Sequence, residues 1–104
     1  MSFVVAYAFR SDFSLSQILD AVRANTSWEW LARDSEFWGE YLSAQSSAQP
    51  VLAKIFVEGN AYLLELKFQD DGLRESWEPV ARGIVNLLLP PLAAIDIRRA
   101  EANN

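Results

Sequence analysis

The chain has 104 residues, of which 51% are hydrophobic, and its formal net charge is −5. These values predict one globular domain over residues 1–100 with a frayed tail at residues 101–104, and they argue against disorder and against nucleic-acid binding, which needs a basic surface. Without cysteine or histidine, disulfides, thiolate metal sites and a Ser-His-Asp triad are excluded, and we expect no cofactor or metal.

Residues 3–9 form the first predicted element, a buried strand with apolar side chains on both faces. Phe3, Val5, Tyr7 and Phe9 lie on one side, and Val4, Ala6 and Ala8 lie on the other. This run and the apolar run at residues 84–89 are much shorter than the ~20 residues that span a bilayer. Polar residues 10–12 also end the first run too early for a signal peptide. We therefore expect a cytoplasmic protein that does not contact a membrane.

A helix is predicted after Ser14, which forms a capping box with Gln17. Apolar residues then recur with helical spacing, and they are Leu15, Ile18, Leu19 and Val22. Asn25 is a typical residue at a helix end. The pattern predicts one amphipathic helix between these limits.

Residues 26–48 contain three of the four tryptophans and fit two structures. As a helix, the segment begins with a capping box of Thr26 and Glu29 and places a polar face opposite an aromatic one. The polar face holds Glu29, Arg33, Glu36 and Glu40, and the aromatic face holds Trp30, Leu31, Phe37, Trp38 and Tyr41. Asp34 falls on the aromatic face, where it would lose hydration.

The alternative for residues 26–48 is a strand, a turn and a second strand. Residues 28–30 alternate in polarity, residues 33–35 suit a polar turn, and Gly39 permits unusual backbone angles. Asp34 then needs no burial. The helical pattern has more matches, but Gly39 and four aromatic residues lower the helix propensity, so both alternatives stand.

A β-hairpin is predicted over residues 51–68, because Gly59-Asn60 suits a two-residue turn. If Glu58 faces Ala61, one side of the hairpin becomes entirely apolar and Lys54 faces Glu65 on the other side. The apolar pairs in this register are Val57 with Tyr62, Ile55 with Leu64, Ala53 with Leu66, and Val51 with Phe68.

The remaining elements are a helix over residues 73–88 and a half-buried strand over residues 94–98. Pro79 either kinks this helix or lies in its true first turn, and Pro90-Pro91 ends it. Asp70-Asp71 precedes the helix. Because the spaced ligands of a calcium loop are absent, we interpret this pair as a capping loop.

The order strand, helix, hairpin, helix and strand predicts an α+β, ferredoxin-like split β-α-β sandwich, with an antiparallel sheet and both helices on one face. The other side of this sheet, which we call the open face, carries apolar residues that need a cover. They are Val4, Ala6, Ala8, Leu52, Phe56 and Leu63. We expect residues 26–48 to fold across this face, in preference to a homodimer mate or another partner.

In size, charge and composition the chain resembles small acidic inhibitor and immunity proteins. The resemblance implies a non-catalytic interaction module that presents carboxylates and aromatic side chains to a basic partner protein. The predicted partner-binding residues are Trp30, Trp38 and Tyr41 as anchors, with Glu29, Glu36 and Glu40 as an acidic rim.

The alternative function is a small-molecule site or an enzyme. In this hypothesis a tryptophan-lined pocket surrounds Asp34, with Arg33 as an anion contact and Trp28 in the wall. Burial would raise the pKa of the Asp34 carboxyl towards the range useful in catalysis.

Overall fold

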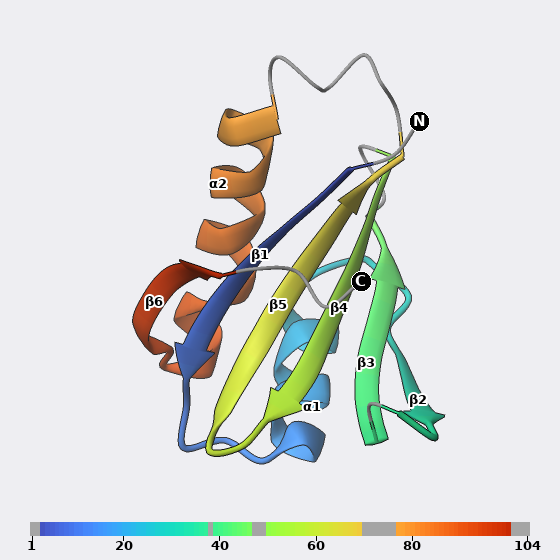
Figure 1. The fold of residues 1–104 in the computed structure, drawn as a ribbon, viewed down its shortest axis with the longest axis vertical. Coiled ribbons are helices and arrows are strands. Elements are labelled where there is room, and N and C mark those ends of the chain that lie inside the picture. Colours follow the sequence, from blue (N-terminus) through green and yellow to red (C-terminus); the bar gives the residue numbers. More distant parts are fainter. Residues whose placement is uncertain (1–2, 38, 47–49, 70–76, 101–104) are drawn as a thin grey trace.

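The computed structural model describes residues 3–37, 39–46, 50–69 and 77–100. One antiparallel sheet forms a layer, and two α-helices cover one of its faces (Figure 1). The elements are β1 (Phe3–Arg10), α1 (Leu15–Asn25), β2 (Leu31–Ser35), β3 (Gly39–Gln45), β4 (Val51–Glu58), β5 (Ala61–Phe68), α2 (Trp77–Leu88), the 3-10 helix η2 (Pro90–Leu92) and β6 (Ile95–Ala100). No helix within the described part of the chain is both long and apolar enough to cross a membrane.

The sheet contains six strands in the order β2-β3-β4-β5-β1-β6. The prediction of an α+β fold with an antiparallel sheet and both helices on one face is confirmed. The specific ferredoxin-like topology is not confirmed, because the sheet is larger and its strand order differs. The difference arises where β2 and β3 extend the sheet beyond β4.

The β4–β5 hairpin has the register predicted from the sequence. Glu58 faces Ala61, Lys54 faces Glu65, and the four predicted apolar pairs lie opposite one another. Gly59 in the turn has a φ of +63°, a conformation that glycine adopts without a steric penalty. The turn and the alternation of side chains therefore agree on one register.

Helix α1 begins and ends where its sequence signals predict. The Ser14 hydroxyl accepts a hydrogen bond from the Gln17 backbone N–H at 3.2 Å, and the Gln17 side chain accepts one from the Ser14 N–H at 2.8 Å. This reciprocal pair satisfies two N–H groups that the helix cannot bond internally. Ile18 and Val22 are buried, because the face of α1 that carries them packs against the sheet.

Helix α2 spans Trp77–Leu88, so Pro79 lies in its first turn, where a missing N–H costs little. Of the two alternatives for Pro79, a kink or a place in the first turn, the second is therefore correct for the described helix. Pro90 begins η2 and ends the α-helical path as expected. The predicted start of this helix at residue 73 and the Asp70-Asp71 loop lie outside the described residues.

Strand β6 is present but is more exposed than the expected half-buried strand. Ile95 and Ile97 both lie on the surface, because β6 is at one edge of the sheet. The pairing of β6 with β1 shifts register between Ala8 and Arg10, and Asp96 has a φ of +54°. This irregularity interrupts the alternation at the edge.

The main core lies between the helices and the sheet, and Val5, Phe9 and Ile55 are among its buried residues. The described residues 26–37 and 39–46 do not fold across the open face. β3 instead pairs with β4 in the plane of the sheet, so that expectation is wrong. On the open face Ala6, Phe56 and Leu63 are buried in a second, smaller cluster within the single chain. The residues packed against this cluster include Ala8, Tyr41 and Ala100.

Candidate functional site

The β2–β3 hairpin settles the two alternatives for the tryptophan segment in favour of strand, turn and strand. Five consecutive residues of β2 pair with β3, from Leu31 opposite Ser43 to Ser35 opposite Gly39. Gly39 has a φ of +69° at the start of β3, which suits glycine at a turn. The helix alternative fails because β4 offers a strand edge to which the β3 backbone can bond. The positions within that alternative are wrong: residues 28–30, expected to form the first strand, precede β2, and residues 33–35, expected to form the turn, belong to β2, so the turn follows Ser35.

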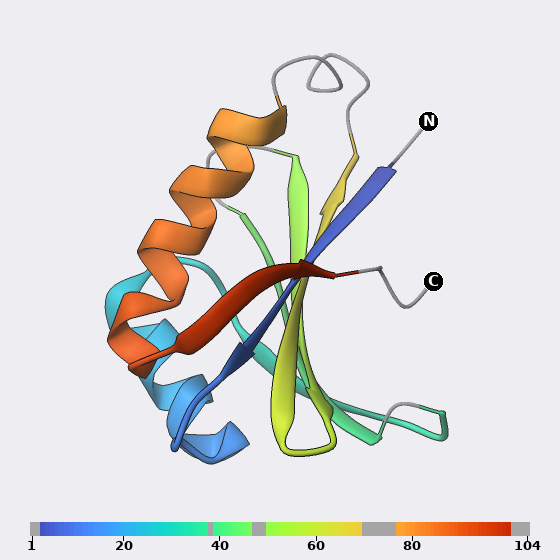
Figure 2. The ribbon, with the colours of Figure 1, turned by 60° about the vertical axis from the view of Figure 1, so that its left-hand side comes forward.

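The tip of this hairpin projects away from the helices and from the rest of the sheet (Figure 2). Phe37 lies in the turn, and its side chain is 88% exposed. The Ser35 hydroxyl accepts a hydrogen bond from the Phe37 backbone N–H at 3.2 Å, which holds the turn. A large apolar side chain is thus presented to solvent at the hairpin tip.

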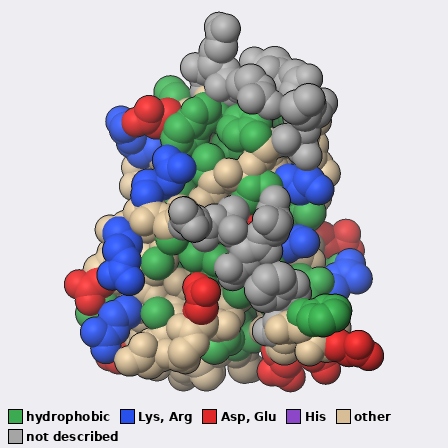
Figure 3. Space-filling view, viewed as in Figure 1, with side chains coloured by type: hydrophobic (Ala, Val, Ile, Leu, Met, Phe, Trp, Pro, Cys, Tyr) green, Lys and Arg blue, Asp and Glu red, His purple; other side chains and the backbone are tan. Residues whose placement is uncertain are grey.

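Carboxylates surround this tip. Asp34 and Glu40 are directly opposite each other on neighbouring strands and are both exposed. Glu36 is exposed in the turn, whereas Glu29 is exposed ahead of β2, at the opposite end of that strand from the tip. Acidic side chains gather at the lower end of β2 and β3, whereas basic side chains are frequent along the opposite side near α2 and β6 (Figure 3). The hairpin therefore forms an acidic surface.

A groove of about 330 Å³ lies between α1 and the hairpin. It brings together Arg33, Asp34 and Glu40 from the predicted site. The complete lining is Leu15, Ser16, Leu19, Ala32, Arg33, Asp34, Glu40 and Leu42. No tryptophan among the described residues lines it, so the predicted tryptophan-walled pocket around a buried Asp34 is not present in this form.

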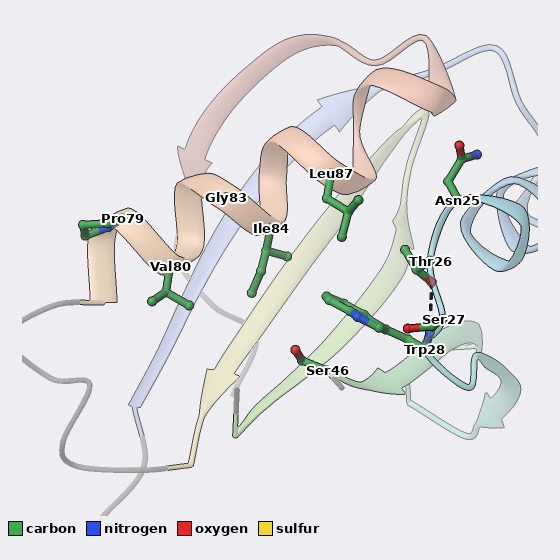
Figure 4. A pocket seen from close by; sticks show the side chains of 10 residues that line it. All are labelled: Asn25, Thr26, Ser27, Trp28, Ser46, Pro79, Val80, Gly83, Ile84 and Leu87. Carbon is green, nitrogen blue, oxygen red and sulfur yellow. Dashed lines mark hydrogen bonds between the residues drawn. The ribbon is translucent and has the colours of Figure 1, made fainter. Parts of the chain in front are cut away.

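Trp28 lines a different groove, of about 620 Å³, between the α1–β2 connection and α2 (Figure 4). Ile84 and Leu87 of α2 face Trp28 across this groove, and Ser46 lies on the β3 side. The described residues that line it include no charged side chain. Trp28 and Asp34 therefore belong to separate surface features, because β2 carries the chain from one end of α1 towards the other.

Trp30 is a core residue and is not available as a surface anchor. Its side chain is 1% exposed, and its indole N–H donates a hydrogen bond to the Thr26 hydroxyl at 3.0 Å. Its ring stacks on that of Trp28 with centroids 5.8 Å apart. The aromatic pattern was compatible with a surface or a core position. Trp30 takes the core position because the chain just before β2 packs beneath α1.

The other two predicted anchors have different outcomes. Tyr41 is half-buried on the open face, where its ring stacks on Phe56 at 5.1 Å and the Lys54 ammonium lies 5.8 Å from its centroid. Trp38 lies outside the described residues. Phe37, which belongs to the aromatic face in the helix alternative, is instead the exposed aromatic residue among those that the structure describes. Its position between the two strands was the available signal.

No cluster of three or more potential Asp, Glu, Cys or His metal ligands occurs among the residues that the structure describes. The chain matches no protein-family model, and no curated protein is detectably similar to it. Functional inference therefore depends on the chemistry of the hairpin and its grooves.

Proposed function

We propose that the protein is a non-catalytic interaction module, of the small acidic inhibitor or immunity type, which binds a basic partner protein through the β2–β3 hairpin. The observation that carries this proposal is the combination of directly opposed carboxylates, Asp34 and Glu40, with the exposed Phe37 at the same tip. Glu36 adds a further negative charge.

The opposed carboxylates favour a cationic partner for an energetic reason. Like charges directly across an antiparallel pair destabilise it, and neither Asp34 nor Glu40 forms an ion pair with a described residue. A partner lysine or arginine would relieve this repulsion. Negative charge on a projecting tip would also accelerate encounter with a basic protein.

Phe37 supplies the apolar part of the proposed interface. Aromatic side chains are enriched at protein interfaces, and a few residues usually carry most of the binding free energy. The acidic residues around Phe37 would orient the partner, and burial of its ring would slow dissociation. Trp30 and Trp28 support the hairpin from the core side and do not contact the partner.

The alternative of an enzyme or small-molecule site around Asp34 has less support. Asp34 is exposed, and the groove beside it contains aliphatic, hydroxyl and charged groups in place of the expected indole rings. Aromatic enclosure and desolvation of this carboxylate were the two features that favoured catalysis.

Affinity capture from an extract of the source cells tests the proposed function. The wild-type protein is expected to retain a basic protein, identified by mass spectrometry, that salt releases. Glu36→Lys/Glu40→Lys should slow association with the purified partner by about tenfold or more at low salt, because the charge is reversed. Phe37→Ala should mainly accelerate dissociation.

Glu78→Lys is the matched control, since Glu78 is an exposed carboxylate on α2, away from the hairpin. This variant should bind like the wild type. Equal losses in Glu78→Lys and in the hairpin variants, or no loss in either, would contradict the proposed role of the hairpin.

A further inference from the structure

Strand β2 lies at one edge of the sheet and pairs without a bulge. It pairs with β3 through five consecutive residues, and the described structure places no strand on its other side. The opposite edge, β6, is interrupted by the register shift and by Asp96, which also forms an ion pair with Arg10 at 3.7 Å. A regular edge can accept another strand, whereas a bulged edge resists it.

The groove beside β2 lies where the side chains of an added strand would point. Leu15 and Leu19 of α1 form its apolar wall, and Ala32 contributes only a methyl group from β2. Leu42, opposite Ala32, is buried beneath this region. An added side chain next to Ala32 would therefore meet aliphatic surface in a cavity of about 330 Å³.

The carboxylates of Asp34 and Glu40 define a second side-chain position of the added strand, on the same face of the sheet. Asp34 is two residues from Ala32, so both side chains point to the α1 side of the sheet. Glu40 and Asp34 form one cross-strand row, and Leu42 and Ala32 form the next. Extending these rows by one strand places a cation beside the carboxylates and an apolar side chain beside α1.

We propose that the partner inserts an extended segment antiparallel to β2, as a seventh strand, with a basic residue opposite Asp34 and a large apolar residue opposite Ala32. This inference rests on the proposed function and names the form of the basic partner. In an antiparallel segment the residue opposite Asp34 comes first, so the motif is a lysine or arginine followed two positions later by a leucine-sized side chain.

A short synthetic peptide with an alternating sequence around Lys-Thr-Leu is the probe. At millimolar peptide, we expect hydrogen exchange to slow at least tenfold at alternate amides of β2, whose N–H groups would then bond to the peptide backbone. The full chain is labelled with ¹⁵N and followed by NMR. Unchanged exchange along β2 would overturn the proposed strand addition.

Two changes in the peptide separate backbone pairing from charge attraction. N-methylation at alternate residues keeps every side chain and the net charge but removes backbone donors, and it should weaken binding at least tenfold. A peptide of the same composition with Lys and Leu adjacent should also bind more weakly, because these side chains then point to opposite faces.

The protein variants complete the test. Asp34→Lys should abolish the exchange protection, Ala32→Trp should reduce affinity at least tenfold by filling the groove, and Glu78→Lys should bind like the wild type. Far-UV circular dichroism checks that each variant is folded, and the N-methylated peptide tests the same pairing without altering the protein.

The outcomes distinguish this inference from the proposed function. Salt-sensitive binding that requires Asp34 and Glu40, but tolerates N-methylation and leaves β2 exchange unchanged, would retain the acidic surface and reject the added strand. If binding of the basic peptides and of the captured partner does not depend on the hairpin carboxylates, both the proposed function and the added strand are rejected.

Discussion

At the scale of single residues, Thr26 connects the end of α1 to the buried Trp28 and Trp30. Its hydroxyl donates to the Val22 carbonyl at 2.8 Å and accepts from the Trp30 indole N–H at 3.0 Å. It also accepts from the Trp28 backbone N–H at 3.3 Å. The sequence interpretation assigned Thr26 to the cap of a second helix, and the structure uses the same hydroxyl to close the first.

Removing that hydroxyl should leave the buried indole N–H of Trp30 without its acceptor. We expect Thr26→Val to lower the free energy of unfolding by about 1–3 kcal/mol, since a buried unsatisfied donor keeps its full desolvation penalty. Thr26→Ser, which retains the hydroxyl, should lose less. Urea unfolding measures both, and equal losses would show that the hydroxyl contributes nothing specific.

Tyr62 gives a prediction about pH. Its hydroxyl donates to the Phe13 carbonyl at 2.6 Å, and burial raises the pKa of Tyr62 above its usual value. The folded state therefore holds this proton more tightly than the unfolded state. Its contribution is fully present below the unfolded pKa of about 10 and is lost as pH rises through the folded pKa.

We accordingly expect the free energy of unfolding to fall above about pH 10, and to fall less steeply in Tyr62→Phe. Below that pH, Tyr62→Phe should be destabilised by about 1 kcal/mol through loss of the hydrogen bond. Urea titrations from pH 8 to 11 test both effects. Parallel pH profiles for the two proteins would exclude Tyr62 as a source of the change.

At the scale of elements, local signals were sufficient for α1 and for the β4–β5 hairpin. The hydrogen bonds between Ser14 and Gln17 join residues three apart, and Gly59 lies within its own turn. The β2–β3 hairpin differs because its aromatic and acidic residues satisfy a helical and an extended pattern together. The free-energy difference between helix and strand that arises from local propensity is smaller than the stabilisation from pairing with a neighbouring strand.

The hairpin should carry a small stability cost where Asp34 faces Glu40. We expect Asp34→Asn to raise the free energy of unfolding by about 0.2–1 kcal/mol at low salt, because it removes a like-charge cross-strand pair. The gain should shrink in high salt. The same variant should bind the proposed basic partner more weakly. Thermal unfolding at two salt concentrations tests the stability effect, and a loss of stability would contradict it.

At the scale of the whole molecule, the two faces of the sheet have different covers. The helices bury one face, and Ala6, Phe56 and Leu63 form a smaller cluster on the open face. The single chain buries these three residues. The predicted homodimer through this face is thus not required for their burial, and it stays a prediction.

Leu63→Lys tests this arrangement, since Leu63 is 1% exposed. We expect a loss of about 3 kcal/mol or more in the free energy of unfolding, from the lost apolar packing and the burial of a charge. The size in solution should not change. The half-buried Leu52 is the control, and Leu52→Lys should cost less.

Light scattering after size exclusion measures the size of both variants. A stable Leu63→Lys monomer obtained from a dimeric parent would instead identify the open face as a dimer interface.

The sequence by itself determined the elements whose signals are local, and it determined which side of β1 and of the β4–β5 hairpin faces the helices. It also excluded thiol and histidine chemistry. Only the tertiary structure decided that residues 31–35 and 39–45 are strands, that Trp30 is buried and that Phe37 is exposed. The physical reason is that β3 depends on the free edge of β4, a partner outside its own sequence window. Once β3 is paired, the turn carries Phe37 away from the core while Trp30 packs beneath α1.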